Sequence, residues 1–100
     1  MAYAAGDLDA TLAAASGDDP ALLAELRGAF MQSLDRQIDL LGRARCDGNW
    51  QVAALRIKGL AASFCAEPLI ALAEEALDAA PGDPAIVRRL RAFLDEFSTD

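Results

Sequence analysis

The chain has 100 residues, a length that suits one domain with one modest hydrophobic core. Sixteen acidic and nine basic side chains give a net charge of −7, which argues against nucleic acid as a partner because no basic stripe is available to neutralise phosphates. Alanine and leucine are abundant whereas aromatic and β-branched residues are few, and this mixture favours helices over strands.

The sequence also carries signals about compartment and metal binding. The first residues lack the basic stretch and apolar run of a signal peptide, and no uncharged apolar run approaches the ~20 residues needed to cross a bilayer. We therefore expect a cytoplasmic protein without membrane contact. Cys46 and Cys65 are expected to be reduced thiols that fill small gaps, and two cysteines without any histidine make a poor zinc site.

Residues 1–6 are expected to form an N-terminal tail, and residues 7–100 a single helical domain. Asp7 is a suitable N-cap for a short helix that ends near Gly17. A helix of this length is too short to be stable alone in water, so it is expected to cover one end of a larger bundle.

The second helix is predicted to start at Asp18-Asp19-Pro20, because an acidic cap followed by proline is a typical helix start. It should extend to about residue 45. Its apolar side chains recur every three or four residues and form one continuous stripe, made of Leu22, Leu26, Phe30, Leu34, Ile38 and Leu41.

Three further helices follow after short breaks. Asn49 is expected to cap a helix over 50–65, and Pro68 to lie in the first turn of the next helix. A tight turn at 81–84 then provides a second Asp-Pro start, at Asp83. The last helix should turn five apolar side chains inward, Ile86, Leu90, Phe93, Leu94 and Phe97.

Short connections between amphipathic helices place neighbours antiparallel. The sequence therefore predicts an all-α fold, an antiparallel up-down-up-down four-helix bundle with a short extra N-terminal helix. No glycine-rich phosphate loop, dinucleotide fingerprint or metal motif is present, and no histidine can serve as a catalytic base. We expect neither an enzyme nor a cofactor.

The most informative segment is the predicted helix that starts at Trp50. One side of it carries an apolar stripe of Trp50, Ala53, Ala54, Ile57, Ala61 and Phe64. The opposite face carries Leu55, Lys58 and a glycine, Gly59, in the middle of the helix. Glycine there costs roughly 1 kcal/mol relative to alanine. One reason to keep it is that another backbone or protein approaches closely at this point.

This segment resembles the active helix of histidine-containing phosphotransfer (HPt) domains. The chain reads W-x-x-A-A-L-x-I-K-G-x-A-x-x-F-C-A, and the common bacterial form of the family is W-x-x-A-A-H-x-L-K-G-x-A-x-x-x-G-A. Seven residues match at the same spacing: Trp50, Ala53, Ala54, Lys58, Gly59, Ala61 and Ala66. Leu55 stands where the family carries its phosphorylated histidine, and Cys65 replaces the usual glycine.

The resemblance implies a fold and a mode of binding. HPt domains are four-helix bundles whose active helix docks on the receiver domain of a response regulator. By that comparison, Lys58 would offer positive charge and Gly59 would leave room for the receiver. The partner-binding residues implied here are Gln51, Leu55, Arg56, Lys58, Gly59 and Ala62. Because the chain has no histidine, it cannot relay phosphate. We therefore expect it to bind a receiver domain or a sensor kinase without transferring phosphate. We also expect a monomer.

Three other interpretations stay open at the level of the sequence. The chain could be a structural or adaptor bundle that pairs with itself or with another helical protein through the face around Leu55. Leu55 could instead fill a surface groove against the second helix. It could also be a change introduced into an otherwise active phosphotransfer protein.

Overall fold

The computed structural model describes the backbone of residues 4–17 and 19–99 and the side chains of residues 10–17 and 19–97. Over these residues the protein is all-α, with five helices and no strand: α1 (Ala4–Ser16), α2 (Pro20–Arg43), α3 (Asp47–Ser63), α4 (Glu67–Asp78) and α5 (Pro84–Thr99). The radius of gyration is 13.5 Å, close to the ~13 Å expected of a compact domain of this length.

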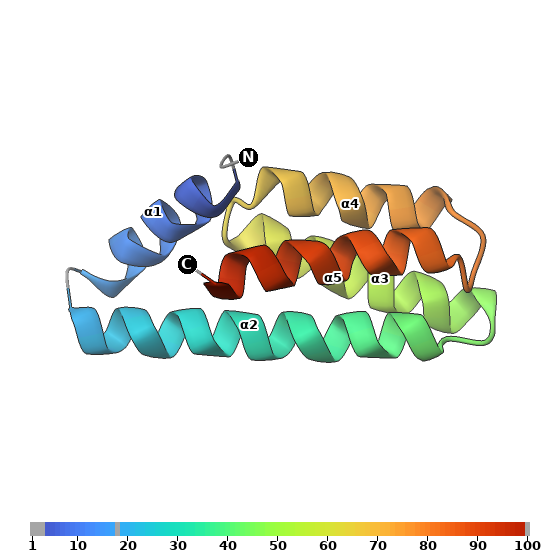
Figure 1. Ribbon diagram of the computed structural model, residues 1–100, viewed down its shortest axis with the longest axis horizontal. Coiled ribbons are helices and arrows are strands. Elements are labelled where there is room, and N and C mark those ends of the chain that lie inside the picture. Colours follow the sequence, from blue (N-terminus) through green and yellow to red (C-terminus); the bar gives the residue numbers. More distant parts are fainter. Residues whose placement is uncertain (1–3, 18, 100) are drawn as a thin grey trace.

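Helices α2 to α5 lie along the long axis of the molecule, and each turns back on the one before it (Figure 1). Contacts join α2 to α3, α3 to α4, α4 to α5 and α5 back to α2, so the four helices surround a common core. α1 lies across one end of this arrangement and contacts α2 and α4 (Figure 1). It contributes the fully buried Leu12 to the core, as expected of a short covering helix.

Both predicted Asp-Pro starts are confirmed for the residues that the structure describes. The Asp19 carboxylate accepts hydrogen bonds from the backbone N–H groups of Ala21 and Leu22, at 3.0 and 3.3 Å, and α2 begins at Pro20. The Asp83 carboxylate accepts from the backbone N–H of Ala85 at 2.9 Å. Each carboxylate satisfies N–H groups that have no partner inside the helix. Asp18, which the predicted start included, lies outside the described residues.

Several predicted boundaries were wrong by two to four residues. α1 begins at Ala4, so Asp7 lies inside the helix and residues 4–6 are helical rather than a tail. α2 ends at Arg43 because Ala44 adopts an extended backbone conformation. α3 begins at Asp47 without a side-chain cap, and Asn49 lies in its first turn. An acidic residue in the first turn of α3 interacts favourably with the positive end of the helix dipole, which compensates for the missing cap.

The core follows the predicted apolar stripes closely. All five inward residues of α5 are buried, as are the four central and C-terminal residues of the α2 stripe, Phe30, Leu34, Ile38 and Leu41. At the start of α2 the stripe leaves the core, since Leu26 is only half-buried and Leu22 is exposed. Phe30 sits between Phe64 and Phe97 in edge-to-face contacts, with ring centroids 5.1 and 5.5 Å away.

The buried indole of Trp50 joins α3 to α4. Its Nε1–H donates a hydrogen bond of 2.7 Å to the backbone oxygen of Ala76 in the last turn of α4, which also accepts one of 3.2 Å from the N–H of the C-cap residue Ala79. A single side chain thus fills the core, pairs its own polar atom and joins α3 to the last turn of α4.

We expect Trp50→Phe to lower the free energy of unfolding by roughly 1–3 kcal/mol, because it removes this donor and leaves a smaller ring in the core. Urea unfolding followed by circular dichroism measures the change. An unchanged unfolding midpoint would mean that the N–H of Ala79, which also donates to the Ala76 carbonyl, satisfies it without the indole.

Candidate functional site

The face predicted to bind a partner lies on the outer side of α3. It consists of six residues, Gln51, Leu55, Arg56, Lys58, Gly59 and Ala62. Lys58 is half-buried and the other five are exposed. We call these six residues the α3 face. Leu55, at its centre, is 54% exposed and is absent from the lining of the groove between α2 and α3. Leu55 therefore lies on open surface rather than buried against α2.

Lys58 lies at the edge of the α3 face that borders α4. Its ammonium nitrogen is 3.3 Å from the Glu74 carboxylate, and both side chains remain about half exposed. An exposed pair of this kind contributes at most about 1 kcal/mol. Lys58 is thus held toward α4 by a weak interaction that a partner's carboxylate can replace.

Gly59 has no packing reason to be glycine. A Cβ atom placed on it would meet nothing within 4 Å outside its own helix turn. Its carbonyl accepts a hydrogen bond from the Ser63 hydroxyl at 3.0 Å, which any residue at position 59 would allow. The close approach that would justify a helix-interior glycine does not come from the described part of this molecule.

Cys65 occupies the one non-glycine position with a positive φ among the described residues, at 55°. The turn after α3 is a Schellman motif, in which the N–H of Ala66 donates to Ala61 O at 2.9 Å and the N–H of Cys65 donates to Ala62 O at 3.2 Å. This is the position where the resembled motif has glycine, which adopts a positive φ without cost. The structure thereby gives a physical reason for a glycine in the motif and marks Cys65 as a strained substitute.

We expect Cys65→Gly to raise the free energy of unfolding by about 1 kcal/mol, because glycine relieves the steric cost of the left-handed conformation. Thermal unfolding under reducing conditions measures the gain. Cys65→Ala is the matched control, since it removes the thiol but keeps the Cβ atom, and it should give no gain. A destabilised glycine variant would contradict the expected strain.

The cysteine prediction was wrong in one respect. Both Cys46 and Cys65 are free thiols, but both are exposed instead of filling gaps in the core. Cys46 is the N-cap residue of α3 and Cys65 follows its C-cap residue, so both lie in the connections at the ends of the helix.

Sequence reasoning missed two residues beside the α3 face. Val52 on α3 and Leu40 on α2 are large apolar side chains that are 48% and 43% exposed. They line the same groove between α2 and α3, which has a volume of about 380 Å³. Both fall outside the buried stripe of their own helix, and that departure is the signal that could have identified them.

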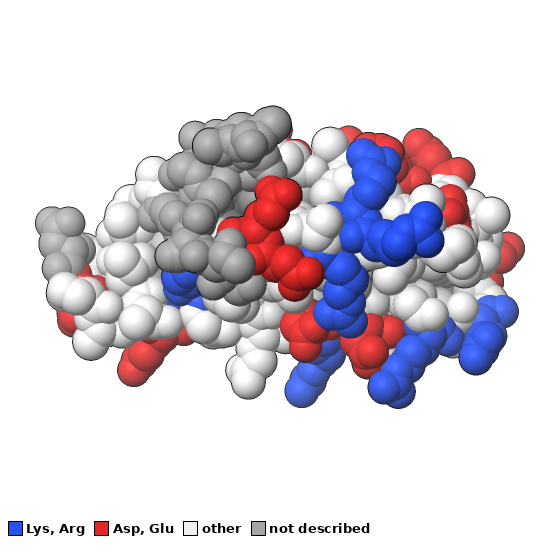
Figure 2. Space-filling model, viewed as in Figure 1, with Lys and Arg blue, Asp and Glu red and all other residues white. Residues whose placement is uncertain are grey.

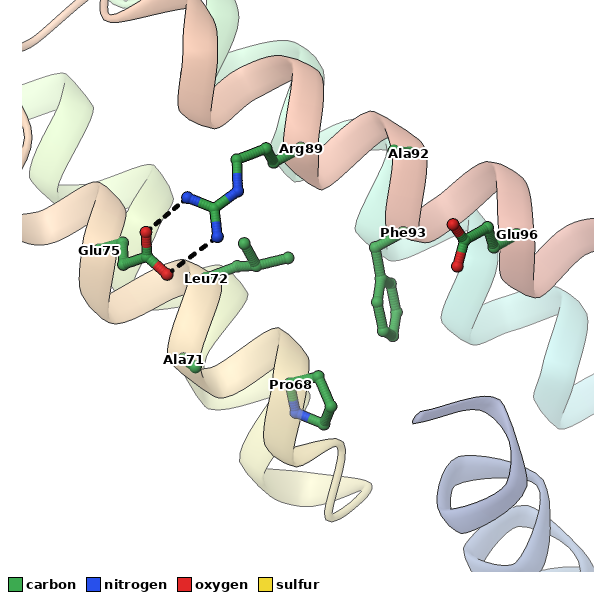
Figure 3. A pocket seen from close by; sticks show the side chains of 8 residues that line it. All are labelled: Pro68, Ala71, Leu72, Glu75, Arg89, Ala92, Phe93 and Glu96. Atoms are coloured by element: carbon green, nitrogen blue, oxygen red, sulfur yellow. Dashed lines mark hydrogen bonds and ion pairs between the residues drawn. The ribbon is translucent and has the colours of Figure 1, made fainter. Parts of the chain in front are cut away.

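A larger groove, of about 670 Å³, lies between α4 and α5 (Figure 3). Pro68, Leu72 and Phe93 give it apolar walls, and Glu75 and Arg89 face each other across it. The two groups are joined by hydrogen bonds of 2.5 and 3.2 Å. The Arg89 guanidinium lowers the pKa of the Glu75 carboxyl, and the carboxylate raises the pKa of Arg89. Because this pair compensates its own charge, the groove offers little to a charged ligand.

The Glu75–Arg89 pair predicts a pH dependence of stability. A carboxyl whose pKa is lowered on folding stabilises the protein at pH values above its ordinary pKa of 4.5, and the contribution is lost as the pH falls through the lowered value. We expect Glu75→Gln to reduce the urea midpoint at neutral pH and to have progressively less effect below pH 4.5. Glu25→Gln, which removes an exposed acid on α2, is the control. A deficit that stays constant down to strongly acidic pH would exclude this linkage.

Ion pairs also connect α5 to α2. Arg91 contacts Asp35 and lies 4.0 Å from Asp39, which pairs in turn with Arg43 at 3.1 Å. On the face of the molecule that carries α5, basic side chains gather on the half nearer the turn between α4 and α5, with acidic side chains beside them (Figure 2). These neighbours compensate much of one another's charge.

The described residues contain no cluster suited to a metal ion, since no group of three or more Cys, Asp or Glu side chains there could hold one. None of the five helices, over the residues described, is long and apolar enough to cross a membrane. Comparison of the chain with protein-family models, with curated proteins and with solved structures gives no match.

Proposed function

We propose that this protein is a histidine-less phosphotransfer-like domain, an up-down-up-down four-helix bundle with an added N-terminal helix, that acts in the cytoplasm. It binds a receiver domain of a response regulator, or a sensor kinase, through the α3 face. It carries no phosphate, because Leu55 stands at the position of the phosphorylated histidine and the chain contains no histidine elsewhere.

One observation supports this proposal more than any other. Gly59 is exposed in the middle of a helix and lies beside Lys58 and the exposed Leu55, yet no contact within the described structure requires it. A glycine that costs stability without an internal reason is expected where another molecule must approach the backbone. Gly59 also lies at the glycine position of the resembled motif, whose helix docks on receiver domains. This agreement suggests that the approaching molecule is a domain with an acidic surface.

The glycine requirement can be tested against a second helix-interior glycine. Gly28 on α2 is also exposed, and a Cβ atom placed on it would likewise meet nothing within 4 Å. Gly59→Ala and Gly28→Ala should both raise the free energy of unfolding by about 0.5–1 kcal/mol. Only Gly59→Ala should weaken binding to a receiver domain, by about tenfold, because the added methyl group lies in the interface. Calorimetric titration with receiver domains from the same genome measures the affinity.

Equal binding by both variants would show that the partner does not approach α3 at Gly59. Failure of the unmodified protein to bind any receiver domain or kinase from the genome would remove the proposal altogether. Sedimentation distinguishes this proposal from the adaptor interpretation. A tight homodimer that buries Lys58 and Gly59 would favour self-association.

Replacing Leu55 by histidine restores the imidazole ring of the resembled motif and tests the docking geometry directly. Leu55 is more than half exposed, so Leu55→His should fold and present its imidazole to solvent. We expect this variant to accept phosphate from a phosphorylated cognate receiver, whereas Leu55→Gln and the unmodified protein should not. Phosphoprotein gel analysis with radiolabelled phosphate measures the transfer. A folded Leu55→His variant that accepts none from any receiver of the genome would indicate that this surface serves another purpose.

A further inference from the structure

The groove between α2 and α3 has features that the α3 face does not explain. Leu40 from α2 and Val52 from α3 meet in it, and each is nearly half exposed. Single exposed apolar side chains are common on protein surfaces. Two that line one groove from different helices form an apolar surface of the kind that marks an interaction site.

A buried polar atom in the same groove lacks a partner. The side-chain oxygen of Gln37, which lines the groove, is buried and accepts no hydrogen bond from any described residue. Most buried polar atoms in folded proteins are paired, and an unpaired one is costly. The oxygen itself is inaccessible, but the Gln37 side chain as a whole is only half-buried, so its rotation on binding would present the oxygen to an N–H or O–H group of an occupant.

The rim of the groove is basic, although the whole chain has a net charge of −7. Arg43 and Arg56 line it from α2 and α3 respectively. Arg56 has no ion-pair partner among the described residues, and the Arg43 side chain is 76% exposed although it pairs with Asp39. Both guanidinium groups can therefore meet a partner's carboxylates, and such complementarity steers association and selects the partner.

The shape of the groove selects the kind of segment that fits. A groove between two packed helices accepts a third helix, whose apolar ridge lies between them. The alternative of strand addition needs a free sheet edge, and the structure has no strand over the residues that it describes.

We propose that the α2–α3 groove binds an acidic amphipathic helix of a partner protein. Apolar side chains of that helix pack on Leu40 and Val52, carboxylates meet Arg43 and Arg56, and a donor group pairs with Gln37. The groove shares Arg56 with the α3 face, but Leu40, Arg43 and Val52 lie outside that face, so the site does not depend on whether a receiver domain docks on Leu55 and Gly59.

The test is a selection from a display library of helical peptides of about 20 residues, whose exposed positions vary between acidic, basic and neutral side chains. The bait is the full chain. We expect the enriched peptides to be acidic, and their amide chemical-shift effects on the labelled protein to centre on Leu40 and Val52. Leu40→Ser and Arg43→Glu should each weaken binding about tenfold.

Matched controls separate this groove from general surface effects. Leu22→Ser removes an exposed leucine from the other end of α2, and Arg88→Glu reverses an exposed charge on α5. Both should change the affinity less than about twofold. Because Leu40 and Arg43 lie on α2, outside the α3 face, loss of peptide binding in their variants is distinguishable from loss of receiver binding in Gly59→Ala.

Gln37→Met tests the unpaired oxygen. It should raise the unfolding midpoint, since a near-isosteric apolar group replaces an unpaired polar one, and it should weaken peptide binding several-fold. The proposal is overturned if no peptide is enriched, if basic peptides are enriched equally, or if Leu40→Ser and Arg43→Glu bind as well as the unmodified protein. A homodimer in sedimentation that Leu40→Ser dissociates would overturn it too, because a second copy of the chain would then be the occupant.

Discussion

The hydrogen bond from the Trp50 indole to the carbonyl of Ala76 fixes how α3 lies on α4, and much of the surface follows from that. The indole is buried at the start of α3, whereas the acceptor lies near the end of α4. Once this contact sets the rotation of α3 about its axis, the small side chains of Ala53, Ala54 and Ala61 face the core. The opposite side, with Leu55 and Gly59, then has to face outward.

Helix α4 shows how neighbouring residues can serve different interfaces. Glu74 pairs with Lys58 on α3, and Glu75 pairs with Arg89 on α5. Adjacent residues on a helix point about 100° apart, so two successive carboxylates reach the helices on either side instead of sharing one site. The two ion-pair partners could not be named from the sequence, because it does not show which helices flank α4.

The sequence predicted which residues of α3 form the candidate site, but not which residues of the neighbouring helices lie beside them. The motif spacing identified Leu55, Lys58 and Gly59, and helical periodicity correctly placed them opposite the buried stripe. The same periodicity could not find Leu40, since its proximity to Val52 depends on the register between two helices. It also could not show that Lys58 already has a partner on α4. Cys65 was recognised as a departure from the motif, but the positive φ that gives it meaning is a property of the folded turn.

The sequence by itself determined the number of helices, the two Asp-Pro starts and the inward faces of α2 and α5, because these depend on local capping and on apolar spacing along one helix. Only the tertiary structure decided which helices are neighbours, how far each apolar stripe is buried, and which exposed side chains meet in a groove. Those features depend on how different helices lie together, as where Leu40 of α2 and Val52 of α3 line one groove. A periodic pattern within one helix contains no information about the rotation and register of the helix packed beside it.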